Sequence, residues 1–278
     1  MKSIEEIIHG IKENLTQTTD SSQTSLTSMP VFKCEKCRDT GWVFLDEDEN
    51  GYRSVRECEC VKVKAAENRI RASGLADEIK EKTFKRFQVN YPWQKEMYDK
   101  AVAYGKAYFK ANESGKKLPW FFIAGNPGCG KTHICTAICG VMLKRGVPVS
   151  YMQWVTDSRK LRAVVNEPDF DIMLEPYLEV EILYIDDLFK QPGNRTPNIT
   201  DAEGKVLFEI VNGRYVRNKA TIISTEWYLD SELMQLDDGT FSRVYERAKD
   251  FRFAVPRDKS VNQRMIAETG GENNASNH

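Results

Sequence analysis

The chain has 278 residues, of which 41% are hydrophobic and 29% charged, which suits one large or two unequal globular domains. Its 40 Lys and Arg residues against 41 Asp and Glu residues give a net charge of −1, so nucleic acid could be bound only through a local basic patch. The absence of a bilayer-length apolar run and of a signal-peptide core predicts a cytoplasmic protein, in which the 7 cysteines favour metal ligation or free thiols over disulfides.

The first 31 residues predict a helix followed by a linker. Residues 1–16 place Ile4, Ile7 and Ile11 on one helical face. A helix this short is marginal alone in water, so it packs either on its own domain or in the groove of a partner, and the pattern leaves both open. Residues 17–31 are rich in Ser and Thr and predict a flexible linker.

Residues 32–61 carry two cysteine pairs, Cys34 with Cys37 and Cys58 with Cys60. The segment between the pairs predicts a short hairpin that brings them together. Four thiolates complete the tetrahedral shell of a structural zinc ion, and a segment with so few apolar residues needs that metal to fold. The second pair is C-x-C rather than the commoner C-x-x-C, so disulfides or unligated thiols remain alternatives. Cysteine at every position leaves no open site for a catalytic water.

Residues 62–93 predict a connecting helix and a lead-in to the main domain. The helix is basic through Lys62, Lys64, Arg69 and Arg71. Such a run is usually a solvated face, although it also allows contacts with phosphates. The main domain is expected over 94–266, beginning with a helix over 94–112, and an unstructured polar tail over 267–278.

The most specific motif is GNPGCGKT, which follows the apolar run 120–124 and precedes a predicted helix over 131–145. This is the G-x-x-x-x-G-K-T phosphate-binding loop in the strand–loop–helix context that it requires. The glycines let successive N–H groups turn toward a polyphosphate, and the helix presents the positive end of its dipole. Lys131 is predicted to reach the β- and γ-phosphates, and Thr132 to ligate Mg²⁺. The predicted nucleotide contacts of the loop are Gly125, Asn126, Pro127, Gly128, Cys129, Gly130, Lys131 and Thr132.

Beyond this loop, strand and helix patterns alternate. Strands are predicted over 149–154, 181–187, 220–226 and 251–255, with helices over 155–165 and 201–218 between them. This order predicts an α/β fold in which helices cover a parallel sheet.

An acidic pair ends the predicted strand EILYIDD. An apolar strand that ends in two acids downstream of a phosphate-binding loop has the form of a Walker B element. Asp186 is predicted to hold Mg²⁺, and Asp187 to orient the attacking water as general base.

Two other pairs are candidates for the same chemistry. Thr225 and Glu226 end a predicted strand where they could sense the γ-phosphate, or they could cap the next helix. Arg243 and Arg247 lie four residues apart on one predicted helix face. An arginine there could complete the site of a neighbouring subunit, or it could form a surface salt bridge with a nearby acid.

Residues 83–265 resemble the AAA+ ATPases of the DnaC/DnaI-type helicase loaders of bacteria and phages. The motifs that carry the resemblance are GNPGCGKT, ILYIDDLFK, LFEIVNGRY, TIISTEW and SRVYERA, in that order. The four cysteines look like those in the N-terminal part of DnaI-like members. The resemblance implies a parallel five-stranded αβα core, ATP hydrolysis with Mg²⁺, self-association through AAA+ domains, binding of single-stranded DNA, and delivery of a hexameric replicative helicase.

The resemblance also assigns roles to individual residues. Lys131 and Thr132 match the Walker A contacts, and Asp186 and Asp187 match the Walker B acids. Thr225 matches the sensor-1 region, Arg243 or Arg247 the arginine finger, and Arg264 the sensor-2 arginine.

The implied DNA contacts fall near Arg159, Lys160 and Arg162, with stacking on Tyr151 or Trp154 as a further option. Aromatic residues on a strand are more often core, so that interpretation of the two rings is preferred.

Two rival functions remain. One is an IstB-type transposition helper, which has the same core, but such proteins commonly lack a four-cysteine module. The other is a zinc-bearing adaptor that binds ATP without hydrolysing it, against which the intact Lys131, Asp186 and Asp187 argue.

Overall fold

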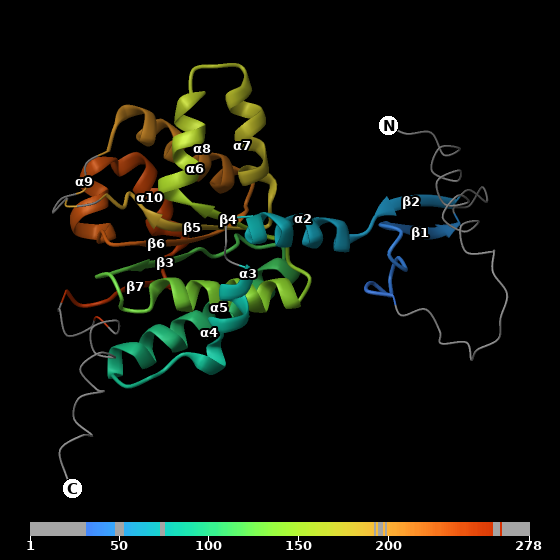
Figure 1. Ribbon diagram of the computed structural model, residues 1–278, viewed down its shortest axis with the longest axis horizontal. Coiled ribbons are helices and arrows are strands. Elements are labelled where there is room, and N and C mark those ends of the chain that lie inside the picture. Colours follow the sequence, from blue (N-terminus) through green and yellow to red (C-terminus); the bar gives the residue numbers. More distant parts are fainter. Residues whose placement is uncertain are drawn as a thin grey trace, which may run out of the picture. The chain divides into compact units, whose positions relative to one another are not determined.

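The computed structural model describes residues 32–47, 53–72, 76–191, 193, 197, 199–257 and 262 (Figure 1). The chain divides into two compact units, one ending at Lys62 and the other beginning at Val63. The predicted N-terminal helix, the linker, the C-terminal tail and Arg264 all lie outside the described residues.

The first unit contains the predicted hairpin, made of β1 (Trp42–Glu47) and β2 (Arg53–Glu57). The strands are antiparallel, and Phe44 lies opposite Val55. Every residue of β2 is exposed, and the buried hydrophobic residues of the described hairpin module are Cys37 and Cys58. The described part of this module therefore has almost no apolar core of its own, as the sequence predicts.

The second unit alternates helices and strands. Helix α2 (Glu59–Ala72) begins before the boundary between the units and ends within the second. The elements that follow are α3 (Ala76–Glu81), the 3₁₀ turn η1 (Phe84–Arg86), α4 (Pro92–Glu113), β3 (Phe121–Ala124), α5 (Lys131–Lys144), β4 (Val149–Gln153), α6 (Trp154–Ala163), α7 (Asp169–Glu179), β5 (Ile182–Leu188), α8 (Asp201–Val216), β6 (Ala220–Thr225), the π-helical turn η2 (Leu229–Leu233), α9 (Met234–Leu236), α10 (Asp238–Arg247) and β7 (Arg252–Ala254).

The five strands of this unit form one parallel sheet in the order β4-β5-β6-β3-β7. Helices α4 and α5 cover one face, and α6, α7, α8 and α10 cover the other (Figure 1). Successive residues of β3 alternate between the two cores, because Phe121 and Ile123 pack toward α4 and α5 while Phe122 and Ala124 pack on the opposite side. Burial on both faces explains why these strands read as continuous apolar runs. The predicted α/β fold with a parallel five-stranded core is confirmed.

Local signals fix where several helices begin. Thr200 and Glu203 form a capping box at the start of α8, in which each side chain bonds the backbone N–H of the other. Asp237 caps α10 by accepting from the N–H of Thr240 at 3.1 Å. None of the helices in the described part of the chain is both long and apolar enough to cross a lipid bilayer.

Candidate active site and metal centre

The phosphate-binding motif forms the turn between β3 and α5. Gly128 and Gly130 have φ of +78° and +95°, in the left-handed region that favours glycine. A Cβ on Gly130 would lie 3.2 Å from Cε2 of Phe87, so a larger residue would also crowd that ring. Lys131 is buried, and its ammonium donates to the carbonyls of Gly125 at 2.7 Å and Asn126 at 3.0 Å. The loop therefore curls around the lysine, which is the cradle that a polyphosphate requires.

Asp186 lies beside this loop and is held by four hydroxyl donors. Its carboxylate accepts from Thr132 at 3.3 Å, Tyr151 at 3.0 Å and Tyr184 at 2.6 Å, and also from Ser224. Burial, and then the charge of Asp186, raises the pKa of both tyrosines, so their hydroxyls remain donors. The carboxylate is thereby fixed next to the Thr132 hydroxyl.

These two oxygens suit Mg²⁺. Adjacent ligands of an octahedral Mg²⁺ at about 2.0–2.1 Å lie about 3 Å apart. The separation of 3.3 Å between Thr132 Oγ1 and Asp186 Oδ1 is close to that value. The donor set, one hydroxyl and one carboxylate, leaves positions for waters and phosphate oxygens.

Asp187 faces a different environment from Asp186. The register of β5 against β6 shifts between Ile185 and Leu188, and Asp187 has a φ of 54°. A bulge of this kind re-aims a side chain, and bulges are common next to active sites. The Asp187 carboxylate accepts from Lys190 Nζ at 2.7 Å, and Glu226 Oε1 lies 3.7 Å from the same nitrogen.

A cleft of about 190 Å³ joins these groups to the phosphate-binding loop. Its lining residues are Lys82, Pro127, Gly128, Gly130, Lys131, Thr132, His133, Asp187, Lys190 and Glu226. Three of these residues, Lys82, His133 and Lys190, were not predicted from the sequence to be part of the site. Asn262, two positions before Arg264 in the sequence, also lies against the loop. A Cβ on Gly128 would collide with the Asn262 side chain.

Two predicted site residues lie elsewhere. Thr225 is fully buried, and its hydroxyl donates to the Leu188 carbonyl at 2.8 Å, so Glu226 rather than Thr225 faces the cleft. Arg247 is 7% exposed and donates to the carbonyls of Leu118 and Tyr215 and to the side chain of Asn218. Arg247 is neither an arginine finger nor part of a surface salt bridge, because its guanidinium donates hydrogen bonds within its own domain.

Arg243 is half-buried. It donates to the Gly239 carbonyl of its own helix and lies 5.9 Å from the ring centroids of Phe208 and Tyr215. Of the two arginines on α10, Arg243 is the less buried.

The predicted DNA contacts are only partly available. Tyr151 and Trp154 are buried, which confirms the preferred interpretation as core residues and removes them as stacking platforms. On α6, Lys160 pairs with Asp157 at 3.0 Å and Arg162 with Glu203 at 3.3 Å, whereas Arg159 is exposed.

In the first unit, the four predicted cysteines come together. Their sulfur atoms all lie within 4.8 Å of one another, with 3.8 Å between Cys34 and Cys58 and 3.4 Å between Cys37 and Cys60. Zinc–sulfur bonds of about 2.3 Å in a tetrahedron place the sulfurs about 3.8 Å apart, so the cluster fits zinc. Burial alone would raise the pKa of the Cys37 thiol, but the Gly41 N–H and the neighbouring thiols outweigh it and lower the pKa to about 7. Burial and the same neighbouring thiols raise the pKa of Cys60, so the thiols of the cluster share the ionisation unequally.

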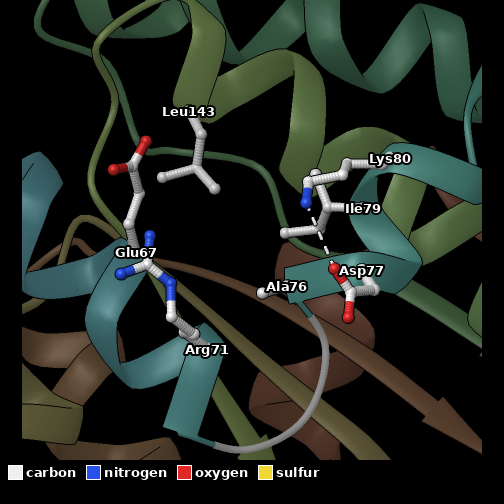
Figure 2. A pocket seen from close by; sticks show the side chains of 7 residues that line it. All are labelled: Glu67, Arg71, Ala76, Asp77, Ile79, Lys80 and Leu143. Atoms are coloured by element: carbon white, nitrogen blue, oxygen red, sulfur yellow. Dashed lines mark hydrogen bonds and ion pairs between the residues drawn. The ribbon is translucent and has the colours of Figure 1, made fainter.

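A second hollow, of about 430 Å³, lies between α2, α3 and the end of α5 (Figure 2). Figure 2 shows Glu67 and Arg71 on α2, and Asp77 and Lys80 joined on α3, where their ion pair measures 3.1 Å. Two acids and two bases leave this hollow without a net charge to attract phosphate, although Arg71, which the sequence allowed as a phosphate contact, lines it.

Two comparisons bear on the family of the chain. A family model described as IstB-like ATP binding protein matches residues 111–244, which include the loop, the acidic pair and Arg243. YqaM of Bacillus subtilis, described as uncharacterized, is 31% identical over 76% of this chain and 66% of its own length. Over residues 111–244 the chain is IstB-like. XkdC, a phage-like element PBSX protein of the same organism, is 26% identical over 79% of this chain and 81% of its own length.

The IstB-like chain is also similar in fold to a solved structure, described as the DnaC helicase loader. That crystal structure aligns with a TM-score of 0.52 at 17% identity, over 64% of this chain and 99% of its own. At this identity the likeness concerns the fold alone. The predicted recognition as a DnaC/DnaI-like AAA+ protein is confirmed at the level of family and fold.

Proposed function

We propose that the protein is an ATPase that assembles with copies of itself and delivers a hexameric replicative helicase onto single-stranded DNA. The observation that carries the proposal is the convergence of Lys131, Thr132 and Asp187 on one cleft at the carboxyl ends of parallel strands, where Thr132 also donates to Asp186. Ligands of open parallel sheets bind at this edge. The match to a family of ATP-binding proteins and the shared fold with a helicase loader support it further.

The residues divide the work of hydrolysis as follows. Lys131 and the loop N–H groups bind the phosphates, and Thr132 and Asp186 would hold Mg²⁺, which neutralises charge on the β- and γ-phosphates. Asp187 orients the attacking water and accepts its proton. The two roles need different environments. Asp186 is tied by hydroxyl groups to one geometry, whereas Asp187 is partly exposed to the cleft, where water can reach it.

Arg243 is proposed to act on the site of an adjacent subunit. Its half-buried side chain donates to the Gly239 carbonyl of its own helix and lies 5.9 Å from the ring centroids of Phe208 and Tyr215 on α8. A guanidinium supplied from a neighbour would stabilise charge on the transferring phosphoryl group. Hydrolysis would then depend on assembly.

The hairpin is proposed to contact the helicase. Trp42, Phe44 and Val55 are 38%, 65% and 37% exposed, and Phe44 and Val55 are cross-strand partners. Apolar side chains gathered on so small a module favour an interaction with another protein. Zinc in the four-cysteine cluster would fix the strands that present them.

One rival function has a specific observation in its favour. The family model that matches is IstB-like, and an IstB-type transposition helper would bind double-stranded DNA. The four-cysteine module argues for the loader instead. A non-hydrolysing adaptor is disfavoured, because Asp187 lines the cleft and a carboxylate there is available as a general base.

The test is copurification of the host's replicative helicase with the full-length protein, with ATP and Mg²⁺ present. The matched control is the Lys131→Ala variant, which should lose the helicase. Fluorescence anisotropy with labelled single- and double-stranded DNA of equal length completes it. Preference for the duplex together with absence of the helicase would favour the transposition helper. The adaptor would be favoured if a measurement of ATP hydrolysis found no turnover, with or without DNA and helicase.

A further inference from the structure

The turn that follows β5 has an unusual backbone. Asp187 and Phe189 have φ of 54° and 56°, and the Lys190 N–H donates to the Asp187 carbonyl at 3.0 Å. Residues other than glycine seldom adopt this left-handed conformation, and it persists only where the surroundings enforce it. Backbone strain of this kind is concentrated at functional sites, so the side chains that this turn positions are candidates for a functional role.

Buried contacts enforce the turn. The Phe189 ring is buried and lies 5.1 Å from the Trp154 ring, edge to face. The Phe189 carbonyl accepts from Trp227 Nε1 at 3.1 Å, and the Asp187 N–H donates to Ser224 Oγ at 3.2 Å. The backbone on both sides of Leu188 is therefore held, and with it the starting point of the Lys190 side chain.

The turn delivers an ammonium group to the nucleotide cleft. Lys190 Nζ lies 2.7 Å from Asp187 Oδ2 and 3.7 Å from Glu226 Oε1, and the residue lines the same cleft as Lys131 and Thr132. The side chains of Lys190, Asp187 and Glu226 are 41%, 26% and 26% exposed. Ion pairs this open to water contribute little to the stability of the fold. The strain of the turn is therefore not explained by the stabilising effect of the Lys190–Asp187 pair.

We propose that Lys190 is a specificity-determining residue for the terminal phosphate of ATP, and that this phosphate competes for it with Asp187. The inference rests on the proposed ATPase function. An ammonium has three donors, and a phosphate that carries more charge than a carboxylate attracts it more strongly. While Lys190 holds Asp187, one oxygen of the proposed general base is engaged. ATP therefore frees that base by drawing Lys190 away, and ADP, which lacks the γ-phosphate, does not.

The experiment compares the affinities of two nucleotides that are not turned over appreciably. Titration calorimetry with Mg²⁺ measures the Kd of ATPγS and of ADP for the wild type, Lys190→Ala and Lys190→Arg. We expect Lys190→Ala to lose about tenfold in affinity for ATPγS, the effect of one charge-assisted contact, and to change less than about twofold for ADP. Lys190→Arg keeps the charge and should retain most of the preference for ATPγS.

A matched control comes from the opposite edge of the sheet. Lys219 pairs with Glu181 at 2.7 Å just before β5 and β6 begin, and it does not line the cleft. Lys219→Ala should leave both affinities unchanged. An equal loss for both nucleotides in Lys190→Ala, or no loss for either, overturns the inference.

Competition with Asp187 has its own measurement. In the Asp187→Asn variant, Lys190 does not have to give up an ion pair with Asp187 when it binds the phosphate, so its contact with the phosphate contributes more to affinity. Lys190→Ala should therefore lower ATPγS affinity by a factor at least about threefold larger in this variant than in the wild type. Additive effects would refute the competition. A wild-type protein that binds neither nucleotide would refute the ATPase function itself, which is a different outcome from normal binding with an indifferent Lys190.

Discussion

Arg243 and Arg247 lie on the same helix, and the structure predicts opposite consequences when each is replaced by methionine. Methionine keeps much of the aliphatic stem and removes the guanidinium. Arg247 donates to Leu118 at 3.2 Å and to Tyr215 and Asn218 at 2.9 Å. Arg243 makes none of these hydrogen bonds; it donates to Gly239 of its own helix and lies 5.9 Å from the ring centroids of Phe208 and Tyr215.

The cost of Arg247→Met can be worked out from these bonds. Three charge-assisted hydrogen bonds contribute about 1.5 kcal/mol each, and the buried Nε–H, which has no acceptor in the described structure, subtracts about 1 kcal/mol. The free energy of unfolding should therefore fall by about 3–4 kcal/mol. In a domain of this size each kcal/mol lowers Tm by about 2–4 °C, so the loss is about 6–16 °C. Arg243→Met loses contacts with the Phe208 and Tyr215 rings and should lower the free energy by about 1 kcal/mol or less.

Activity should show the reverse order. Below its own Tm, Arg247→Met should hydrolyse ATP at near the wild-type rate, whereas Arg243→Met should be impaired although fully folded. Mixing Arg243→Met subunits with Asp187→Asn subunits should restore part of the activity. In that mixture an Asp187→Asn subunit still supplies Arg243 to a neighbour whose own Asp187 is intact.

The assays are thermal unfolding followed by circular dichroism and phosphate release across a series of mixing ratios. A stable but inactive Arg247→Met protein would contradict the structural role of Arg247. Failure of every mixture to exceed the sum of its components would contradict an arginine acting between subunits.

Three other perturbations test separate parts of the structure. Lys131→Ala should weaken ATP binding by well over tenfold in calorimetry, because the loop loses the cation at its centre. Metal analysis should find one zinc per chain. Cys58→Ser should release the zinc and raise amide exchange across residues 32–60. The control Cys139→Ser, at a buried cysteine outside the cluster, should do neither. Arg214→Met should cost about 3–5 kcal/mol in denaturant unfolding, because its fully buried guanidinium donates to Tyr177, Leu178, Val180, Glu181 and Ala220 carbonyls.

The sheet and the hairpin could be predicted because their signals are local. Apolar runs bounded by turn residues locate β3, β5 and β6, and cysteine spacing locates the ends of the hairpin. Helix α7 was not predicted, and its interior contains Pro176. The proline removes a bond to the Ile172 carbonyl, but Ile172 is 72% exposed, so water can replace that bond. Burial of Phe170, Leu174 and Leu178 on one face then stabilises the helix.

The two arginines of α10 could not be told apart by their spacing alone. Residues four apart differ by about 40° around a helix, so both were placed on one face. Arg247 lies between the buried Val244 and Ala248 in sequence, at the border of the packed face, and a long side chain there can reach inward to carbonyls. The role of Arg247 depends on acceptors from segments distant in the sequence, at Leu118, Tyr215 and Asn218, and the spacing of residues on α10 does not reveal them.

Strand alternation accounts for the remaining difference at the site. Tyr184 of β5 lies opposite Ile222 of β6, and side chains two residues further along share their face, so Ser224 and Asp186 both point toward the side that α5 covers. Thr225 points to the opposite side, where it is buried and its hydroxyl donates to the Leu188 carbonyl. The same rule would send Asp187 into the other core, but the bulge and the left-handed turn redirect it to the cleft together with Lys190. The two adjacent acids therefore have separate roles because regular alternation ends between them: Asp186 belongs to the strand and is fixed, whereas Asp187 belongs to the turn and faces the cleft.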